Sequence, residues 1–204
     1  GMFILTGAAG DKVSYEASQY GQGLLTYSLL QGMSGLALTA DKRVDVMTLF
    51  QYARDEVPAL AKSIRQVQTP VLAFPADGGS FDIGIVDATV KIPLAQVKPV
   101  FIRNNFQDEE AFDDGLGLTK ALADYFQQIT ARGAQAELIF VDVTEYENAY
   151  SIKGRYSISG ESVTVRGRLF QGKTAKGEFS VMGKKTALPA LAEAIVDKVS
   201  GMLE

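Results

Sequence analysis

An apolar stretch near the start of the chain, followed by a glycine-containing loop, limits the fold more than any other feature. Residues 3–5 (FIL) lead into the small-residue loop 6–11 (TGAAGD), and a Leu-rich segment opens after Gly21 and Gly23. This pattern predicts a buried strand, a loop at its carboxyl end and then a helix. In open α/β sheets, ligands bind beside such loops.

Composition limits the class of protein. The chain has 204 residues, of which 47% are hydrophobic, so one large or two small folded domains are expected. The net charge of −4 argues against a nucleic-acid partner, and the basic residues cluster only at Arg166, Arg168, Lys173 and Lys176. No apolar run approaches the roughly 20 residues that span a bilayer, so no membrane span is predicted.

The chain contains no cysteine and no histidine. This excludes disulfides, thiolate metal sites and thiol nucleophiles, and it removes the commonest general base. The hydroxyls of Thr6 and Ser14 have no base to activate them, so loop hydrogen bonding is the favoured role for both. We therefore predict no catalytic residue, no metal and no cofactor.

Hydrophobic spacing in the first half predicts two helices and two strands. One helix starts at Leu24, and a second follows Asp45, a candidate N-cap. Pro58 is expected to break or kink the second helix, and Leu60, Ala61 and Ile64 indicate a further turn or two beyond it. Strands are predicted at 69–74 and at 81–85, where alternation is typical of an edge strand.

The second half has its own pattern, with strands at 100–106 and 138–143 and a three-stranded meander over 150–182. Helices are predicted at 116–131 and after Pro189, giving the order β-α-β-β-β-β-α. The fold class is therefore α/β, and the second half is a mostly antiparallel sheet with its helices on one face.

A region with two prolines and little pattern separates the halves. We place the domains at residues 1–88 and 99–204, joined by a linker at 89–98.

Four ordered motifs in the first half carry a family resemblance: GDKVSYE at 10–16, YGQGLLTY at 20–27, the segment 41–60, and TPVL at 69–72. Together they resemble the small-subunit region of bacterial caspase-like, metacaspase-like peptidases. The resemblance implies the C-terminal half of a caspase-like α/β sheet. In that family the catalytic histidine and cysteine precede this region.

The resemblance also implies a substrate site. Metacaspase-type relatives use acidic loop side chains to bind a basic residue before the scissile bond, which implies roles for Asp11 and Glu16, with Gly10 and Ser14 beside them in the same loop. A carboxylate suits a guanidinium because it accepts two charge-assisted hydrogen bonds. The alternative is that Asp11 caps a turn and Glu16 is solvated.

The second half resembles the amino-terminal domain of TolB and FlgO-like envelope modules, through YSIKG at 150–154 and GESVTV at 160–165. Segment 173–177 departs from the tighter Thr-Gly turn of these relatives. The resemblance implies a protein-binding, non-enzymatic domain, and it favours the bacterial envelope or periplasm over the cytoplasm.

Two charged clusters have alternative interpretations. The acidic residues within 108–114 suit either a hard cation or the dipole of the following helix, and the helix is favoured. Arg155, Arg166 and Arg168 are expected on one polar sheet face, either solvated or facing an anionic partner.

These inferences give two hypotheses. In the first, the chain is the non-catalytic C-terminal portion of a caspase-like endopeptidase, and its exposed sheet edge pairs with the missing N-terminal half or with a second copy. In the alternative, it is a stand-alone, envelope-associated adaptor that binds proteins.

Overall fold

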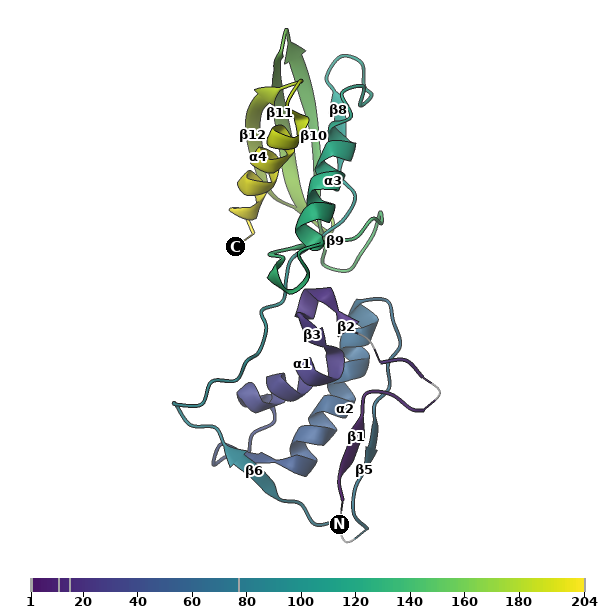
Figure 1. Ribbon diagram of the computed structural model, residues 1–204, viewed down its shortest axis with the longest axis vertical. Helices are drawn as coiled ribbons and strands as arrows, with labels where there is room; N and C mark the ends of the chain where they lie inside the picture. Colours follow the sequence, from purple (N-terminus) through teal and green to yellow (C-terminus); the bar gives the residue numbers. More distant parts are fainter. Residues whose placement is uncertain (1, 11, 15, 77, 204) are drawn as a thin grey trace. The chain divides into compact units, whose positions relative to one another are not determined.

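The computed structural model describes residues 2–10, 12–14, 16–76 and 78–203, without the side chains of residues 16–18 and 134 (Figure 1). The chain divides into two compact units, residues 1–97 and 98–204, called here the first and second units. Both combine helices with strands, as the α/β prediction requires.

Two helices form the centre of the first unit. Helix α1 (Leu24–Gln31) continues into a π-helical turn, η2 (Gly32–Leu36), and packs against α2 (Val46–Ser63). Buried side chains on and beside these helices form two small clusters, one around Leu24 and Val57 and one around Val44 and Leu49. Gly32 permits this approach, because a Cβ there would lie 2.7 Å from Leu49 Cδ1.

Helix α2 begins at the predicted N-cap and is continuous past Pro58. Asp45 is the N-cap, and its carboxylate accepts hydrogen bonds from the Thr48 backbone N–H and hydroxyl, both at 2.8 Å. Of the break or kink expected at Pro58, the break does not occur, because the helix runs through the proline to Ser63. The fully buried Val57 and Ala61 hold this turn against the core, and the proline itself lies on the exposed side.

In the described part of the first unit, the strands form three separate antiparallel pairs. They are β1 (Ile4–Thr6) with β5 (Val71–Ala73), β2 (Glu16–Ala17) with β3 (Gln22–Gly23), and β4 (Arg43–Asp45) with β6 (Asp82–Ile85). A short 3-10 turn, η1 (Ser18–Tyr20), separates β2 from β3.

Residues 86–99, all of which the structure describes, contain no helix or strand and lead to β7 (Val100–Phe101). Gln22 Nε2 donates to the Pro93 carbonyl at 2.9 Å, and Leu94 packs against the cluster around Leu24. Most of the expected linker, 89–98, therefore lies in the first unit.

The second unit contains six strands and two long helices among its described residues. In chain order these are β7 (Val100–Phe101), β8 (Asn105–Asp108), α3 (Leu118–Thr130), a 3-10 turn η3 (Gly133–Gln135), β9 (Ile139–Phe140), β10 (Tyr150–Ser159), β11 (Ser162–Gln171), β12 (Thr174–Lys184) and α4 (Leu188–Ser200).

The predicted first strand, 100–106, is two strands in the structure, so the predicted element order needs correction. Both β7 and β8 pair in parallel with β10. Between them, the Asn104 side chain replaces the backbone as hydrogen-bond partner, because its Oδ1 accepts from Ile152 N at 3.2 Å.

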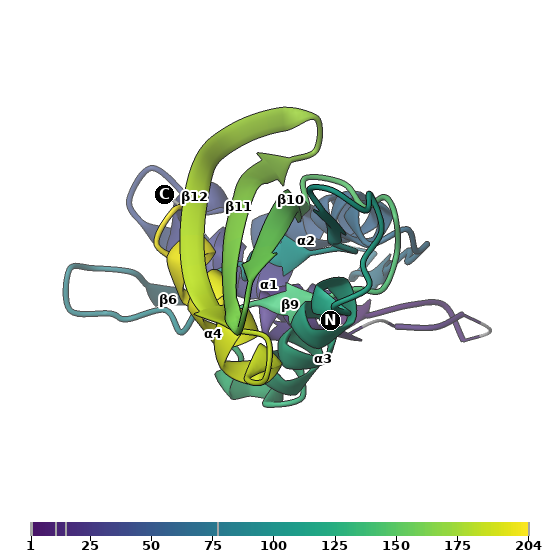
Figure 2. The ribbon, with the colours of Figure 1, turned by 90° about the horizontal axis from the view of Figure 1, so that it is seen from above.

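The long ladders of the sheet run β12-β11-β10 and are antiparallel. Helices α3 and α4 lie side by side against one face of the sheet (Figures 1 and 2). Between helices and sheet is one continuous core, in which Phe126 stacks on Phe101 at 4.7 Å and on Phe140 at 5.7 Å between ring centroids. The opposite sheet face is not covered by these helices.

Candidate functional site

The two acidic residues predicted to bind substrate lie outside what the structure describes. Asp11 is not among the described residues, and of Glu16 only the backbone is described, paired with Gly23 in the β2–β3 ladder. Gly10 lies exposed in its loop, with no atom within 4 Å of where a Cβ would be.

Ser14 contributes to a hydrogen-bonded anchor of the loop. The buried Gln68 directs its Nε2 at the Gly7 carbonyl (2.8 Å) and at Ser14 Oγ (3.3 Å). A Cβ at Gly7 would lie 2.6 Å from Ser14 Oγ, so only glycine permits this contact. The serine hydroxyl therefore ties the loop to the segment before β5, which is the role expected from the lack of a base.

The acidic segment 108–114 serves turns and a helix end. Asp108 Oδ1 accepts from the backbone N–H groups of Glu110 and Ala111, and Asp114 accepts from those of Leu118 and Thr119 at the start of α3. Among the described residues, no group of three or more acidic side chains is arranged to hold a metal ion. The helix interpretation of this cluster is the one that the hydrogen bonds support.

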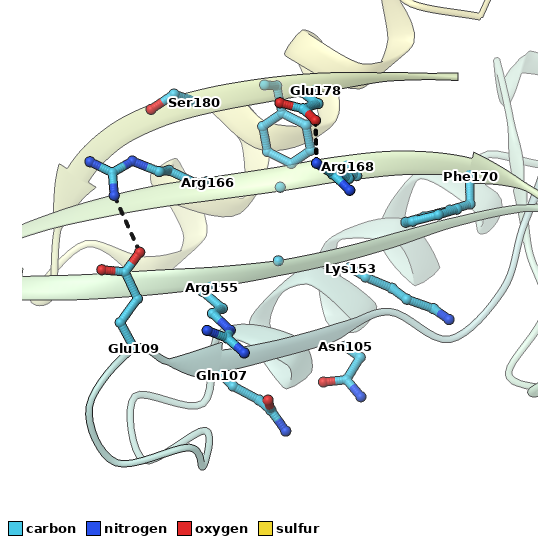
Figure 3. A pocket seen from close by; sticks show the side chains of 13 residues that line it. Asn105, Gln107, Glu109, Lys153, Arg155, Arg166, Arg168, Phe170, Glu178 and Ser180 are labelled. Carbon is cyan, nitrogen blue, oxygen red and sulfur yellow. Dashed lines mark hydrogen bonds and ion pairs between the residues drawn. The ribbon is translucent and has the colours of Figure 1, made fainter. Parts of the chain in front are cut away.

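A groove lies on the uncovered sheet face of the second unit (Figure 3). It has a volume of about 870 Å³ and draws its lining from β8, β10, β11 and β12. We call it the cross-strand groove. Its lining residues are Asn105, Gln107, Glu109, Lys153, Gly154, Arg155, Arg166, Gly167, Arg168, Phe170, Glu178, Phe179 and Ser180.

Strand register arranges the polar side chains of the groove in two rows. One row runs across the strands as Asn105, Lys153, Arg168 and Glu178. The other row runs as Gln107, Arg155, Arg166 and Ser180. Both rows project from the same sheet face, because residues two apart on a strand point to the same side. Figure 3 shows the two rows on either side of the groove.

The floor between the rows is backbone at Gly154 and Gly167, which lie opposite each other on β10 and β11. A Cβ at Gly167 would meet the Phe179 ring at 2.4 Å, and one at Gly154 would meet the Phe106 ring at 2.7 Å. These aromatic rings therefore lie directly against the glycine backbone on the helix-covered side. The glycines allow the close packing that supports the floor of the groove.

The groove contains more cationic side chains than carboxylates, and the cations on β10 and on β11 have different kinds of partner. On β11, Arg166 pairs with Glu109 at 3.3 Å and Arg168 pairs with Glu178 at 2.5 Å. On β10, Lys153 Nζ lies 5.5 Å from the centroid of the Phe170 ring.

The second β10 cation has a similar environment. Arg155 Cζ lies 5.6 Å from the centroid of the Phe112 ring. Within the described part of the chain, neither Lys153 nor Arg155 forms an ion pair with a carboxylate. The β10 cations are thus held by aromatic rings and keep their charge uncompensated.

A smaller hollow of about 350 Å³ lies between α3 and α4. It is acidic, with Asp124 and Glu193 in its lining, and burial together with nearby Glu193 raises the pKa of Tyr125. It lacks the opposed rows of the cross-strand groove. The groove is therefore the better candidate for a binding site, and its chemistry is that of anion binding.

The sequence pattern found part of this site. Alternation along the meander predicted that Arg155, Arg166 and Arg168 share a polar face, and the structure places them together in the groove. Asn105, Gln107 and Glu109 were missed, because their place depends on the parallel pairing of β8 with β10, about 50 residues away.

No protein family matches the chain, and no curated protein matches it. Two similar solved structures are both of the PelC dodecamer from Paraburkholderia phytofirmans. A single-residue variant is 15% identical with a TM-score of 0.30, and the match covers 48% of this chain and 84% of that chain. The other is 20% identical with a TM-score of 0.29, covering 52% and 88%. At these TM-scores the likeness carries no conclusion about fold or function. Among the described residues, no helix is both long and apolar enough to cross a membrane.

Proposed function

We propose that this chain is the non-catalytic C-terminal portion of a caspase-like cysteine endopeptidase. In this proposal the first unit supplies part of the substrate cleft, and the second unit binds a partner. The chain has neither cysteine nor histidine, so the thiolate and its base would come from a segment outside this sequence.

The observation that carries the proposal is the uncovered β1–β5 ladder. Ile4 of β1 and Val71 of β5 lie on the same face of this ladder, and their side chains are 40% and 45% exposed. Both strands lie in apolar runs, 3–5 and 71–74, that do not alternate with polar residues. Strands with such runs are typical of sheets buried on both faces, so the ladder is suited to receive further strands and a covering layer.

Strand β6 has the same property. Its residues are all exposed, with Ile83 at 50% and Ile85 at 54%, and among the described residues it pairs with β4 alone. Apolar side chains along an edge strand favour association with another chain segment. This supports completion of the first unit by a missing half over self-sufficiency.

The proposed contribution to the cleft is recognition of a basic side chain. The resemblance assigns this role to Asp11 and Glu16, whose carboxylates would bind an arginine or lysine before the scissile bond. Gly10, which is exposed and unobstructed, would lie beside the bound peptide.

The test begins with the mass of the native protein, detected with an antibody raised against the second unit. The proposal expects a species much heavier than the 21.9 kDa of this chain, or a processed fragment accompanied by its other half. That species should cleave peptides after arginine or lysine. Asp11→Ala and Glu16→Ala should lower kcat/KM by tenfold or more, whereas Asp41→Ala in another exposed loop should leave it unchanged. A heavy species without such cleavage, or with cleavage indifferent to Asp11 and Glu16, would contradict the proposal.

A second candidate is a stand-alone, envelope-associated adaptor without enzymatic activity. The cross-strand groove favours it, because this anion-binding site lies wholly within the second unit and uses no residue of the first. A native species at the mass of this chain that begins with an initiator methionine, recovered in the envelope fraction, would support this candidate and end the peptidase proposal.

A further inference from the structure

We propose that the cross-strand groove binds a short acidic peptide segment of a protein partner, in extended conformation, with Lys153 and Arg155 as its main anchors. This inference rests on the part of the proposed function that assigns partner binding to the second unit. It does not depend on the peptidase part.

The dimensions of the groove fit an extended peptide. Four neighbouring strands span about 14 Å across the sheet, which accommodates about four residues at about 3.3 Å each. The two rows are two residues apart along the strands, so they stand about 7 Å from each other. Successive side chains of an extended peptide point to opposite sides, so consecutive acidic residues would reach both rows.

The charge pattern places the strongest attraction at the centre of the groove. Arg166 and Arg168 already have carboxylate partners, whereas Lys153 and Arg155 contact aromatic rings. A ring restrains a cationic side chain without occupying its N–H donors. A carboxylate at Lys153 or at Arg155 would therefore meet a cation with no internal ion pair to break, and the guanidinium can bind it through two hydrogen bonds.

The ends of both rows on β8 are amides. Asn105 lies opposite Lys153 and Gln107 opposite Arg155 in the parallel ladder. Their side-chain N–H groups can donate to carboxylate or peptide carbonyl oxygens, and their carbonyl oxygens can accept from peptide N–H groups. A groove that offers both donors and acceptors beside its cations suits a peptide, which presents both kinds of group.

The same pattern disfavours a nucleic acid. Glu109 and Glu178 lie at the groove beside the β11 arginines, and they would face the regularly spaced phosphates of a strand that continued past the central cations. A short run of carboxylates concentrated at Lys153 and Arg155 would keep clear of Glu109 and Glu178.

The test is a fluorescence-anisotropy titration of the full chain into a dye-labelled hexaglutamate peptide, with hexaglutamine as the uncharged probe. We expect saturable binding of hexaglutamate that weakens with added salt, and no measurable binding of hexaglutamine. The double variant Lys153→Ala/Arg155→Ala should lose affinity by at least tenfold, because it removes both proposed anchors. Both side chains are exposed, so their loss leaves the core intact.

The matched control removes the same charge elsewhere. Lys62 on α2 and Lys198 on α4 lie outside the groove, and Lys62→Ala/Lys198→Ala should keep the affinity within twofold. Arg155→Lys, which keeps the charge but not the paired donors, should give an intermediate loss. Circular dichroism of each variant should match that of the parent chain.

Three results would overturn the inference: no binding of hexaglutamate, equal loss in the control variant, or tighter binding of a single-stranded oligonucleotide of the same charge than of hexaglutamate. Each of them leaves the peptidase proposal standing if the heavy native species still cleaves basic peptides. Conversely, a stand-alone native protein that binds hexaglutamate through Lys153 and Arg155 would retain this inference and end the peptidase proposal.

Discussion

The two units differ in how completely their apolar strand surfaces are covered. In the second unit, strands of ten or eleven residues pair over their whole length, and α3 and α4 cover their apolar face to form one continuous core. In the first unit, the strands form three short pairs, and the buried side chains gather in two small clusters around the helices. The difference indicates that the second unit supplies its own cover, whereas the first leaves apolar strand surface open.

Equivalent side chains make the difference concrete. Ile152 on β10 is fully buried, whereas Ile83 on β6 is 50% exposed. Full burial of such a side chain contributes about 1.5–3 kcal/mol, so each open position in the first unit represents stabilisation that a covering segment would add. This is the physical basis for expecting the first unit to associate.

The largest expected effect lies in the core of the second unit. Phe126→Ala removes a fully buried ring stacked between two others and should lower the free energy of unfolding of this unit by about 3–5 kcal/mol. Gln127→Ala, one residue further along α3 and exposed, is the control and should change it by less than about 0.5 kcal/mol. Amide hydrogen exchange during urea unfolding would measure both. Equal destabilisation of α2 by Phe126→Ala would contradict separate cores.

Glycine substitutions offer a second comparison between the units. Gly167→Ala on β11 would force a Cβ into the Phe179 ring and should cost about 1–3 kcal/mol. Gly84→Ala on β6 meets no atom within 4 Å and should cost nothing measurable in this chain. Thermal unfolding followed by circular dichroism would separate the two variants. A stable Gly167→Ala would show that the Phe179 ring does not depend on the glycine.

The N-cap of α2, Asp45, provides a test in the helical part of the first unit. Although burial alone would raise the pKa of Asp45, hydrogen bonds from Ser80 and Thr48 lower it. Asp45→Ala should cost about 1 kcal/mol, whereas Asp55→Ala in the exposed middle of the same helix should cost less.

The pH dependence of that effect has a definite sign. Because the folded pKa of Asp45 lies below its unfolded value, the stabilisation is present above the unfolded pKa of about 3.9 and is lost as the pH falls through the folded pKa. The difference between the parent chain and Asp45→Ala should therefore be constant near neutral pH and shrink in acid. A difference that grew in acid would contradict the capping role.

The smallest effects come from removing one methylene at matched positions. Ile152→Val should cost about 0.5–1.5 kcal/mol, and Ile83→Val should cost close to nothing in this chain. If a missing half covers β6, the same Ile83→Val change should become costly in the heavy native species. Urea midpoints of the two variants, measured with and without that half, would show whether the exposed position is an interface.

Local patterns in the sequence predicted much of the second unit, because most of its strands and helices follow short-range alternation or helical spacing. Alternation along 150–182 predicted the meander, and the pattern over 116–131 predicted a helix where α3 lies. The interruption at Asn104 was not predictable, since it depends on one side-chain hydrogen bond to a strand 48 residues away. The two rows of the groove likewise needed the parallel pairing of β8 with β10.

In the first unit, local rules and packing disagreed more often. The break allowed for at Pro58 does not occur, because Val57 and Ala61 pack tightly enough to keep the helix continuous. The apolar runs at 3–5 and 71–74 predicted strands correctly, but their typical two-sided burial is not met within the described residues.

Hydrogen–deuterium exchange of the full chain, resolved to individual strands, tests the central claim most directly. The account predicts that amides of β10 and β11 exchange slowly, near the limit set by global unfolding, while those of β1, β5 and β6 exchange orders of magnitude faster, since short ladders without cover open locally. In the heavy native species, β1 and β5 should become protected. Equal and slow exchange of β1, β5 and the meander in this chain alone would contradict the claim that the first unit is incomplete.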